Sequence, residues 1–361
     1  MIALRVLVFI VGAVLVPIAL ISATRTFVLA RAAPDPIVRA TFLYVRKLFR
    51  LRIRFLKEYD DRDRVMALYA PASLLMLPMV WLTVVLFGYT AMYWALGMPS
   101  VRAAFTASGS SLLTLGFSPV EDFPETVLSF TEAAIGLVLI ALFISYLPTM
   151  YAAFSRREAM VTRLELRAGS PPTGPEFLRR LKQLDMLDDT KQIWEQWEHW
   201  FVELEETHTS LAALPFFRSP QPQRSWVTAA GAVLDACVLS IAALERPREP
   251  QAELCARAGS VTLQHIAEYF RIEFNPYPTP DHPISVTRAE FDAACNRLAA
   301  DGLRMREDGD RAWRDFSTLR AQYDTVLLAL AALTMAPYAP WSSDRATGFI
   351  PGSRLTNTRD D

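Results

Sequence analysis

Three long stretches without any charged residue constrain the fold of this chain more than any other feature. They lie between Arg5 and Arg25, between Arg64 and Arg102, and between Glu132 and Arg156. An uncharged apolar stretch of about 18 residues or more is typical of a helix that crosses a lipid bilayer. The sequence therefore predicts an integral membrane protein with three membrane helices in its first 155 residues.

The composition agrees with a membrane protein. Hydrophobic residues make up 52% of the 361 residues, and the mean hydropathy of +0.19 exceeds what one soluble core usually needs. The three cysteines have no CxxC spacing and no even count, so a reducing compartment is the simpler interpretation. The net charge of −1 is itself uninformative, and no nucleic-acid partner is expected.

The distribution of positive charge predicts the topology. Residues 25 to 64 hold eleven Lys and Arg, whereas residues 98 to 125 hold one, Arg102. Since cytoplasmic segments of membrane proteins carry an excess of Lys and Arg, we expect the basic segment in the cytoplasm. Met1 then lies outside the cell membrane, residues 98 to 125 face outside, and the chain from Arg156 onward is cytoplasmic. The same charges argue against a cleaved signal peptide, although a small-x-small site follows the first stretch.

The basic segment also has an amphipathic pattern. Five apolar residues recur at helical spacing: Phe42, Val45, Phe49, Ile53 and Leu56. Arginines and lysines stand between them, as in helices that lie in the interface of a membrane. Two interpretations remain open, since the cations either satisfy the preference for positive cytoplasmic segments alone or also bind anionic lipid.

The segment from Pro99 to Pro124 is the most informative one. It is too long for a tight turn between two membrane helices and too apolar for an ordinary water-exposed loop, so we expect part of it to re-enter the membrane. Irregular backbone at membrane depth is tolerated only where it is buried in protein or lines a water-filled path. Residues 101 to 113 are expected to form a short helix that leads into residues 114 to 118, called the filter segment below.

The filter segment reads Thr114, Leu115, Gly116, Phe117 and Ser118. Its first four residues match, in order, the Thr-x-Gly-(Tyr/Phe)-Gly filter of tetrameric potassium channels. Residues 66 to 158 resemble the pore domain of that family, including its two-pore-domain branch. The resemblance implies a homotetramer in which the Thr114 hydroxyl and the carbonyls of residues 114 to 117 bind K⁺ in place of water. It also implies that no cofactor is needed besides the permeant ion.

The segment departs from the family pattern at its outer end. Ser118 stands where the family has its second filter glycine, and Pro119 stands where an aspartate commonly follows. The aromatic pair usual in the pore helix is missing. These departures affect the outermost ion site, so the resemblance implies a preference for K⁺ over Na⁺ that is imperfect.

Three residues of the expected inner helix, residues 126 to 155, are candidates for supporting roles. Glu132 is its one charge, and we expect it either behind the filter segment, bonded to a polar group of the preceding helix, or hydrated at the outer interface. The polar groups considered are those of Ser108, Ser110, Ser111 and Arg102. Gly136 lies where inner helices of the channel family have a hinge glycine, but it also suits close helix packing. Pro148 is placed to kink the cytoplasmic end of the helix.

After Arg156 the chain is expected to be soluble and helical. Periodic segments cover 190–212, 225–245, 250–272 and 286–335, with Pro-rich breaks between them. A stripe of large residues on the first of these segments is interpreted as a core contact. It consists of Trp194, Trp197, Phe201, Leu204, His208 and Leu211. No nucleotide-binding loop or nucleophile and base set is evident, so we expect no enzyme.

The complete expectation is an all-α protein of membrane helices with a re-entrant pore helix and filter loop, plus a cytoplasmic helical domain. Its parts are a first membrane helix (1–24), the basic segment (25–64), a pore domain (65–158) with pore helix (101–113), filter (114–118) and inner helix (126–155), the cytoplasmic domain (159–341) and a flexible tail (342–361). The expected function is a potassium-selective channel whose helical domain regulates or assembles it. A non-selective monovalent cation channel and a non-conducting, membrane-anchored interaction protein remain as alternatives.

Overall fold

The computed structural model describes residues 2–29, 35–56, 58–279 and 282–346. Over these ranges the chain forms thirteen α-helices and two 3₁₀ helices, and its one pairing of extended residues is an isolated bridge between Leu244 and Met305. The predicted all-α class is confirmed. The chain divides into two compact units. We call Met1–Lys57, Val65–Ala152 and Ser210–Leu214 the membrane unit, and Glu58–Arg64, Ala153–Thr209 and Pro215–Asp361 the helical unit.

Three apolar helices are long enough to cross a membrane, as the uncharged stretches predict. They are α1 (Ile2–Phe27), α4 (Tyr69–Leu96) with the short α3 (Tyr59–Ala67) before it, and α6 (Phe123–Ala168). At about 1.5 Å per residue, about 20 helical residues span the hydrocarbon core, and each of the three is longer than that. α6 extends well beyond the expected inner helix, because polar residues that form helices readily follow its apolar part.

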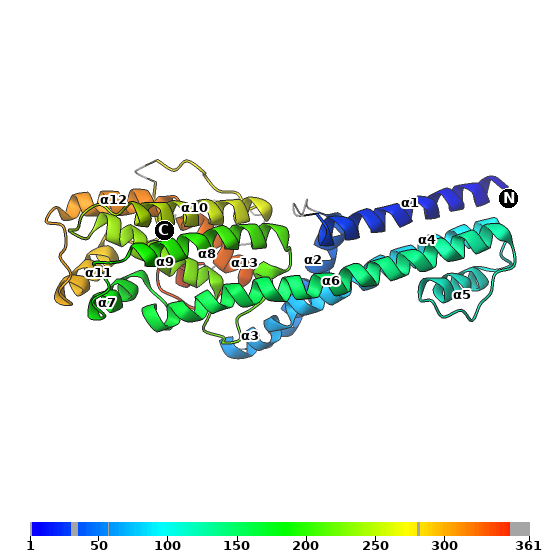
Figure 1. Cartoon of the computed structure of the whole chain (residues 1–361), viewed down its shortest axis with the longest axis horizontal. Coiled ribbons are helices and arrows are strands. Elements are labelled where there is room, and N and C mark those ends of the chain that lie inside the picture. The colour runs from blue at the N-terminus through cyan, green and yellow to red at the C-terminus, as the bar shows by residue number, and fades with distance from the viewer. Residues whose placement is uncertain (1, 30–34, 57, 280–281, 347–361) are drawn as a thin grey trace. The chain divides into compact units, whose positions relative to one another are not determined.

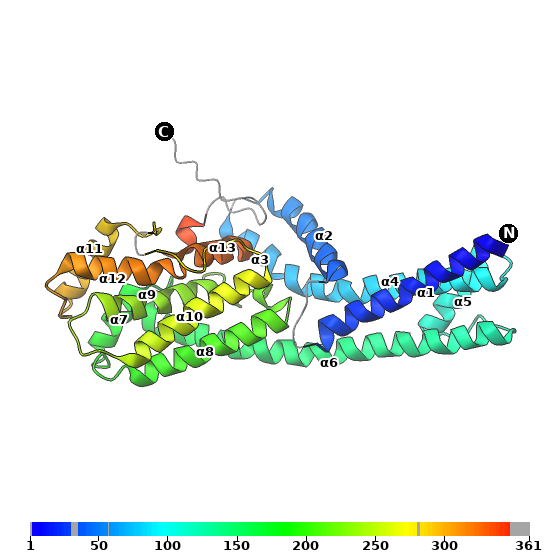
Figure 2. The same cartoon turned by 90° about the horizontal axis from the view of Figure 1, so that it is seen from above.

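α1 packs along α4 through two glycines at close range (Figure 2). A Cβ atom on Gly12 would lie 2.4 Å from the carbonyl oxygen of Gly88, so only glycine allows this approach. Such small-residue contacts are typical of helices packed in a membrane. Further along, the Trp81 indole donates to Ser22 Oγ at 2.9 Å, and Ser22 Oγ donates to Asp35 Oδ1 at 2.7 Å.

α2 (Pro36–Ile53) begins at this carboxylate. Asp35 Oδ1 also accepts from two backbone N–H groups of the first turn and thereby caps the helix. Phe42 and Val45 of α2 are buried, and the rings of Phe42 and Phe49 pack on Tyr69 of α4, with centroids 6.2 and 5.9 Å apart. These three residues of the stripe that suggests an interfacial helix therefore contact protein.

α5 (Val101–Leu112) lies where the sequence predicts a short helix over 101–113. The Ser100 hydroxyl caps its N-terminus by accepting from the N–H of Ala103 at 3.1 Å. α5 folds back beside α4 and α6 (Figure 1). At its far end, a Cβ atom on Gly136 would lie 2.3 Å from the carbonyl oxygen of Leu112, so α5 ends against the backbone of α6.

The helical unit is built around α9, which is buried along almost its whole length. α9 contacts α7, α10, α12 and α13. The bounds are α7 (Gly174–Gln183), α8 (Lys191–Ser210), η1 (Leu214–Phe216), α9 (Trp226–Ala242), α10 (Pro250–Tyr269), α11 (Arg288–Ala300), α12 (Gly309–Ala321), α13 (Asp324–Thr334) and η2 (Ser343–Arg345). Trp194, Trp197, Phe201 and Leu204 of α8 are buried in this core, in agreement with the interpretation of the stripe.

Residues 58–64 belong to the helical unit, although the sequence places them in the basic segment. The reason is Arg218, whose guanidinium pairs with the buried carboxylate of Asp63. The same guanidinium donates to the carbonyl oxygens of Thr334 and Met335 at 2.9 and 3.1 Å. These contacts fix the start of α3 to the C-terminal end of α13.

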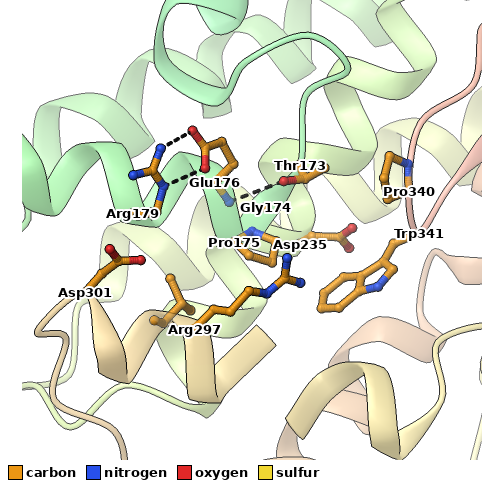
Figure 3. A pocket seen from close by; sticks show the side chains of 11 residues that line it. Thr173, Gly174, Pro175, Glu176, Arg179, Asp235, Arg297, Asp301, Pro340 and Trp341 are labelled. Carbon is orange, nitrogen blue, oxygen red and sulfur yellow. Dashed lines mark hydrogen bonds and ion pairs between the residues drawn. The ribbon is translucent and has the colours of Figure 1, made fainter. Parts of the chain in front are cut away.

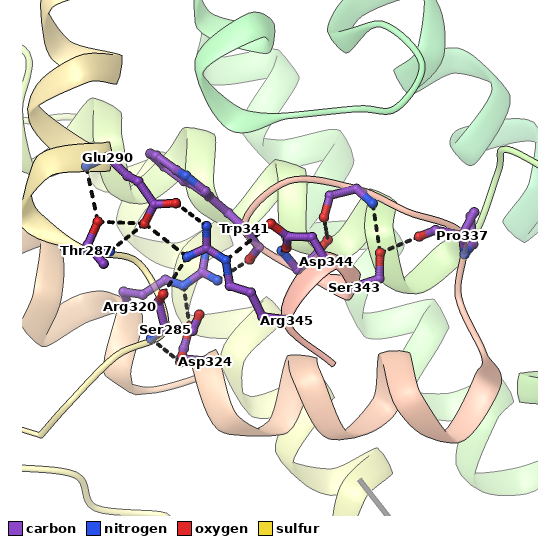
Figure 4. A network of polar contacts seen from close by, with 12 residues as sticks. Ser285, Thr287, Glu290, Arg320, Asp324, Pro337, Trp341, Ser343, Asp344 and Arg345 are labelled. Carbon is purple, nitrogen blue, oxygen red and sulfur yellow. Dashed lines mark hydrogen bonds and ion pairs between the residues drawn. The ribbon is translucent and has the colours of Figure 1, made fainter. Parts of the chain in front are cut away.

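A buried arginine links the last helices of the helical unit (Figure 4). Arg320 donates from Nε to Asp324 Oδ1 at 2.9 Å, pairs with Asp235 and donates to the carbonyl oxygen of Trp341. Arg345 pairs with Glu290 in the same region. Residues 342–346, expected as part of a flexible tail, are thus bonded to the core, and residues 347–361 lie outside the described residues.

Candidate functional site

The filter segment is attached to the last turn of α5 by hydrogen bonds to Ser110. The backbone N–H groups of Leu115 and Gly116 donate to the carbonyl oxygen of Ser110 at 2.8 and 3.4 Å. The N–H of Ser118 donates to the Ser110 hydroxyl at 3.1 Å. Thr114 has φ = 53° and Gly116 has φ = 72°, so the chain enters the left-handed region twice in three residues. These turns fold the segment onto the end of α5.

The carbonyl groups of the filter segment are unused by the rest of the chain. No described residue donates a hydrogen bond to the carbonyl oxygens of residues 114–117. In the single chain these four residues are exposed, Leu115 by 59% and Phe117 by 63%. Carbonyl oxygens that accept no hydrogen bond within the chain are chemically suited to replace the water shell of a monovalent cation when several copies of the segment converge.

Glu132 lies on α6, behind α5, and is fully buried. The Ser108 hydroxyl of α5 lies 2.5 Å from Glu132 Oε1 and 3.0 Å from the carbonyl oxygen of Leu86 on α4. Glu132 Oε2 and the Tyr93 hydroxyl are both buried and have no hydrogen-bond partner among the described residues. This burial does not fit a hydrated glutamate at the outer interface. Of the partners considered from the sequence, Ser108 is the one found.

Other hydroxyl groups join α5 and α4 to α6. Ser111 Oγ of α5 lies 2.8 Å from Ser129 Oγ of α6, and the Tyr89 hydroxyl of α4 donates to Thr131 Oγ1 at 3.0 Å. A buried polar group is costly unless it is hydrogen-bonded, so these pairs favour one orientation of α5. Sequence reasoning missed Ser129, although its place three residues before Glu132 puts it on the same helix face.

Gly136 and Pro148, the two residues considered for a hinge, differ in their surroundings. Gly136 provides the space for the Leu112 carbonyl described above, which is the packing role left open by the sequence. Pro148 is exposed and lies inside α6, which is a single helix from Phe123 to Ala168. A proline within a helix removes one backbone hydrogen bond, so Pro148 is the weakest point of the α6 backbone ladder.

A second candidate site is a cavity of about 170 Å³ in the helical unit (Figure 3). It is lined by the first turn of α7, by Asp235, Arg297 and Trp341, and by neighbouring residues. Two of its charged groups are paired with each other, since Arg179 donates to Glu176 at 2.6 and 2.7 Å, and Asp235 pairs with Arg320, which does not line the cavity. In the described part of the chain, no cluster of three or more His, Cys, Asp or Glu is arranged to hold a metal ion.

The strongest candidate is therefore the filter segment with its supporting residues on α4, α5 and α6. Comparison with known proteins finds no matching family model, no similar curated protein and no similar solved structure.

Proposed function

We propose that the protein is a potassium-selective ion channel of the cell membrane whose pore is formed by four copies of the chain. One observation carries the proposal: residues 114–117, which are exposed in the single chain and whose carbonyl oxygens accept no hydrogen bond from a described residue, directly follow a short helix packed between two membrane-length helices. Irregular backbone is tolerated at membrane depth only where it is buried in protein or lines a water-filled path, and we infer the second case here. α5 is the re-entrant pore helix in this proposal, and α6 lines the pore.

The chemistry of the filter segment favours a monovalent cation. Carbonyl oxygens and the Thr114 hydroxyl replace the hydration shell of the ion, so no charged side chain and no cofactor is required. The C-terminus of α5 directs its partial negative charge toward the same place, which favours a cation over an anion. One chain supplies only one side of such a cage. A closed homotetramer supplies four equivalent sides, with the pore on its axis.

The topology in this proposal follows the positive-inside rule. Met1 and the filter segment face outside, and the helical unit lies in the cytoplasm, where it regulates or assembles the pore. No enzymatic activity is proposed for the helical unit.

A flux experiment tests the proposal. Purified protein is reconstituted into liposomes, and K⁺ efflux is compared for the wild type, Gly116→Ala and Gly97→Ala. Both glycines have positive φ and no atom within 4 Å of an added Cβ, so both substitutions strain the backbone without a clash. We expect wild-type flux, its loss in Gly116→Ala and its retention in the Gly97→Ala control.

The alternatives correspond to other outcomes of the same experiment. Equal K⁺ and Na⁺ flux would favour a non-selective monovalent cation channel. No flux from correctly assembled wild-type protein would favour a non-conducting, membrane-anchored interaction protein. Unchanged flux in Gly116→Ala would place the ion path outside the filter segment.

A further inference from the structure

α2 has two apolar faces, and only one of them is covered by the described residues of the chain. Phe42 and Val45 are buried on the side of α4. The other face exposes five large hydrophobic side chains by 47% to 74% of their surface: Leu43, Tyr44, Leu48, Leu51 and Phe55. Residues 43, 44, 47, 48 and 51 follow the spacing of one helix face. The four apolar residues among them and Phe55, which follows the end of α2, form an exposed strip that we call the outer face of α2.

Positive side chains lie in and beside this outer face. Lys47 lies within the strip, and four exposed arginines flank it: Arg39, Arg50, Arg52 and Arg54. α2 contains no Asp or Glu, so none of these charges is neutralised within the helix. A soluble docking surface for a protein partner rarely combines so many aliphatic side chains with charge of a single sign. An amphipathic helix with apolar and cationic residues together is typical of contact with a membrane surface.

The orientation of α2 is fixed by its neighbours. Asp35 at its N-terminus accepts from Ser22, five residues before the end of α1, and Ser22 in turn accepts from Trp81 of α4. The middle of α2 rests on Tyr69 in the first turn of α4. The helix thus lies where one membrane-length helix ends and the next begins. At that level the hydrocarbon of a bilayer gives way to the headgroups.

We propose that the outer face of α2 binds anionic phospholipid headgroups of the bilayer that holds α1, α4 and α6. Leu48 and Leu51 then enter the boundary of the acyl chains, while Lys47, Arg50 and Arg52 meet the phosphate groups. Cations near an anionic membrane surface each contribute about 1 kcal/mol, which corresponds to about fivefold in lipid preference per cation. The proposal holds whether or not the filter segment conducts ions.

The test measures which lipid lies against α2 in the full-length protein. Leu48→Cys is introduced in a Cys295→Ser background, since Cys237 and Cys255 are buried. The cysteine is labelled with a small fluorophore, and the protein is reconstituted into mixed phosphatidylcholine and phosphatidylglycerol vesicles. Two preparations have the same lipid ratio, but bromine quenchers are attached to the acyl chains of one lipid or of the other.

We expect brominated phosphatidylglycerol to quench the label more strongly than brominated phosphatidylcholine. The difference should disappear in the triple variant Lys47→Gln, Arg50→Gln, Arg52→Gln. It should persist in a matched variant that removes three exposed arginines of the helical unit, Arg163→Gln, Arg304→Gln and Arg314→Gln. Size-exclusion profiles confirm that both variants remain assembled.

Three results would overturn the proposal. Equal quenching by the two lipids in the unmodified background would show that the cations are only hydrated. Absence of quenching by either lipid would place the outer face in water or against protein. An equal loss of preference in both triple variants would trace the effect to total charge instead of α2.

Discussion

At the scale of single residues, Glu132 is the most unusual group of the membrane unit. It is a fully buried carboxyl group on an apolar helix, and only one of its oxygens has a hydrogen-bond partner among the described residues. Ionisable groups in such places are expensive and typically functional. The bond from Ser108 connects it to α5, whose last turn holds the filter segment, so Glu132 is positioned to stiffen that segment.

The first prediction compares three variants of this contact. Glu132→Gln keeps the bulk and an acceptor for Ser108, so its stability should stay within about 1 kcal/mol of the wild type, whereas Glu132→Ala should lose about 1–3 kcal/mol. Ser108→Ala removes the same bond from the other side and serves as the matched control. Thermal unfolding in detergent measures all three. If the pore proposal holds, Glu132→Gln also shortens single-channel openings without changing assembly, and wild-type gating would remove the bracing role.

His208 of α8 is the corresponding group in the helical unit. Its ring is fully buried, packs on Trp226 at 4.7 Å, and lies 3.4 Å from Arg157 Nη1 and 3.2 Å from Thr207 Oγ1. Burial, and then the adjacent positive charge of Arg157, lower the pKa of His208 well below its usual value of 6.5. The ring is therefore neutral in the folded protein, as expected for a packing residue.

The second prediction follows from this lowered pKa. Below about pH 6.5 an unfolded chain binds a proton at His208 and the folded chain does not, so the free energy of unfolding should fall as the pH decreases. Protonation of His208 in the unfolded chain changes the free energy of unfolding by at most about 1.4 kcal/mol per pH unit. Chemical unfolding followed by tryptophan fluorescence between pH 5 and 8 measures it. His208→Gln should reduce the slope, the exposed His199→Gln should not, and equal slopes in all three proteins would contradict the assignment.

At the scale of elements, the contact between α5 and α6 depends on a missing side chain. The Leu112 carbonyl occupies the space that a Cβ atom on Gly136 would need, whereas a Cβ atom on Gly109 would meet only Leu86 Cδ1 at an ordinary 3.8 Å. The two glycines therefore differ in what an alanine would do.

The third prediction uses these glycines as a matched pair. Gly136→Ala should lower the stability of the membrane unit by about 1–3 kcal/mol, because α5 must move away from α6. Gly109→Ala should be neutral or stabilise α5 by up to about 1 kcal/mol through helix propensity. Thermal unfolding of the two variants in detergent provides the comparison. Equal stability of both would mean that α5 and α6 tolerate a wider separation.

The elements were predictable from the sequence where a single physical signal decided them. Absence of charge located α1, α4 and α6, and helical periodicity located α8, α9 and α10. Residues 286–335, expected as one helical stretch, form three helices. The first break lies where Gly302 at φ = 84° follows the end of α11 and Asp308 caps α12, and the second lies between Ala321 and Asp324. Periodicity alone does not reveal such breaks, since the apolar pattern continues on both sides of them.

The candidate site was predictable in its residue types but not in its contacts. The filter segment follows from the resemblance, and the pairing of Glu132 with a serine of α5 follows from the cost of a buried charge. The bonds from the filter segment to Ser110 were not predictable, because they depend on the φ angles of Thr114 and Gly116. The sequence also did not predict which face of α2 packs against protein, since both faces of that helix are apolar.

At the scale of the whole molecule, the fourth prediction concerns assembly. One filter segment supplies a single side of a coordination cage, so a conducting pore requires four copies on a common axis. Native mass spectrometry of the protein in lipid nanodiscs should give a species of four times 40.5 kDa. As a control for loss of subunits during preparation, the same mass is measured after solubilisation that keeps bound lipid. A stable monomer or dimer under these conditions would remove the pore proposal altogether.

Selectivity is also a property of the assembled pore, and Ser118 is the residue that should limit it. A glycine at this position turns its carbonyl inward at little cost, because glycine adopts positive φ freely. Ser118 stays outside the left-handed region, and its N–H is held by the Ser110 hydroxyl. In the proposed pore, the outermost carbonyl is therefore free to turn away from the axis, which would leave fewer ordered sites in series.

The fifth prediction is that the wild-type pore prefers K⁺ over Na⁺ imperfectly and that Ser118→Gly raises the K⁺/Na⁺ permeability ratio. Discrimination depends on the number and field strength of the coordinating carbonyl dipoles, and the glycine restores one ring of them. Reversal potentials under bi-ionic conditions measure the ratio in both proteins. Ser110→Ala is the control, because it removes the hydroxyl that accepts from the Ser118 N–H but keeps the serine at position 118. It separates the effect of losing this hydrogen bond from the effect of the glycine backbone. A wild-type pore without any K⁺ preference would refute the proposed selectivity, whereas a strictly selective pore unchanged by Ser118→Gly would refute only the role of Ser118.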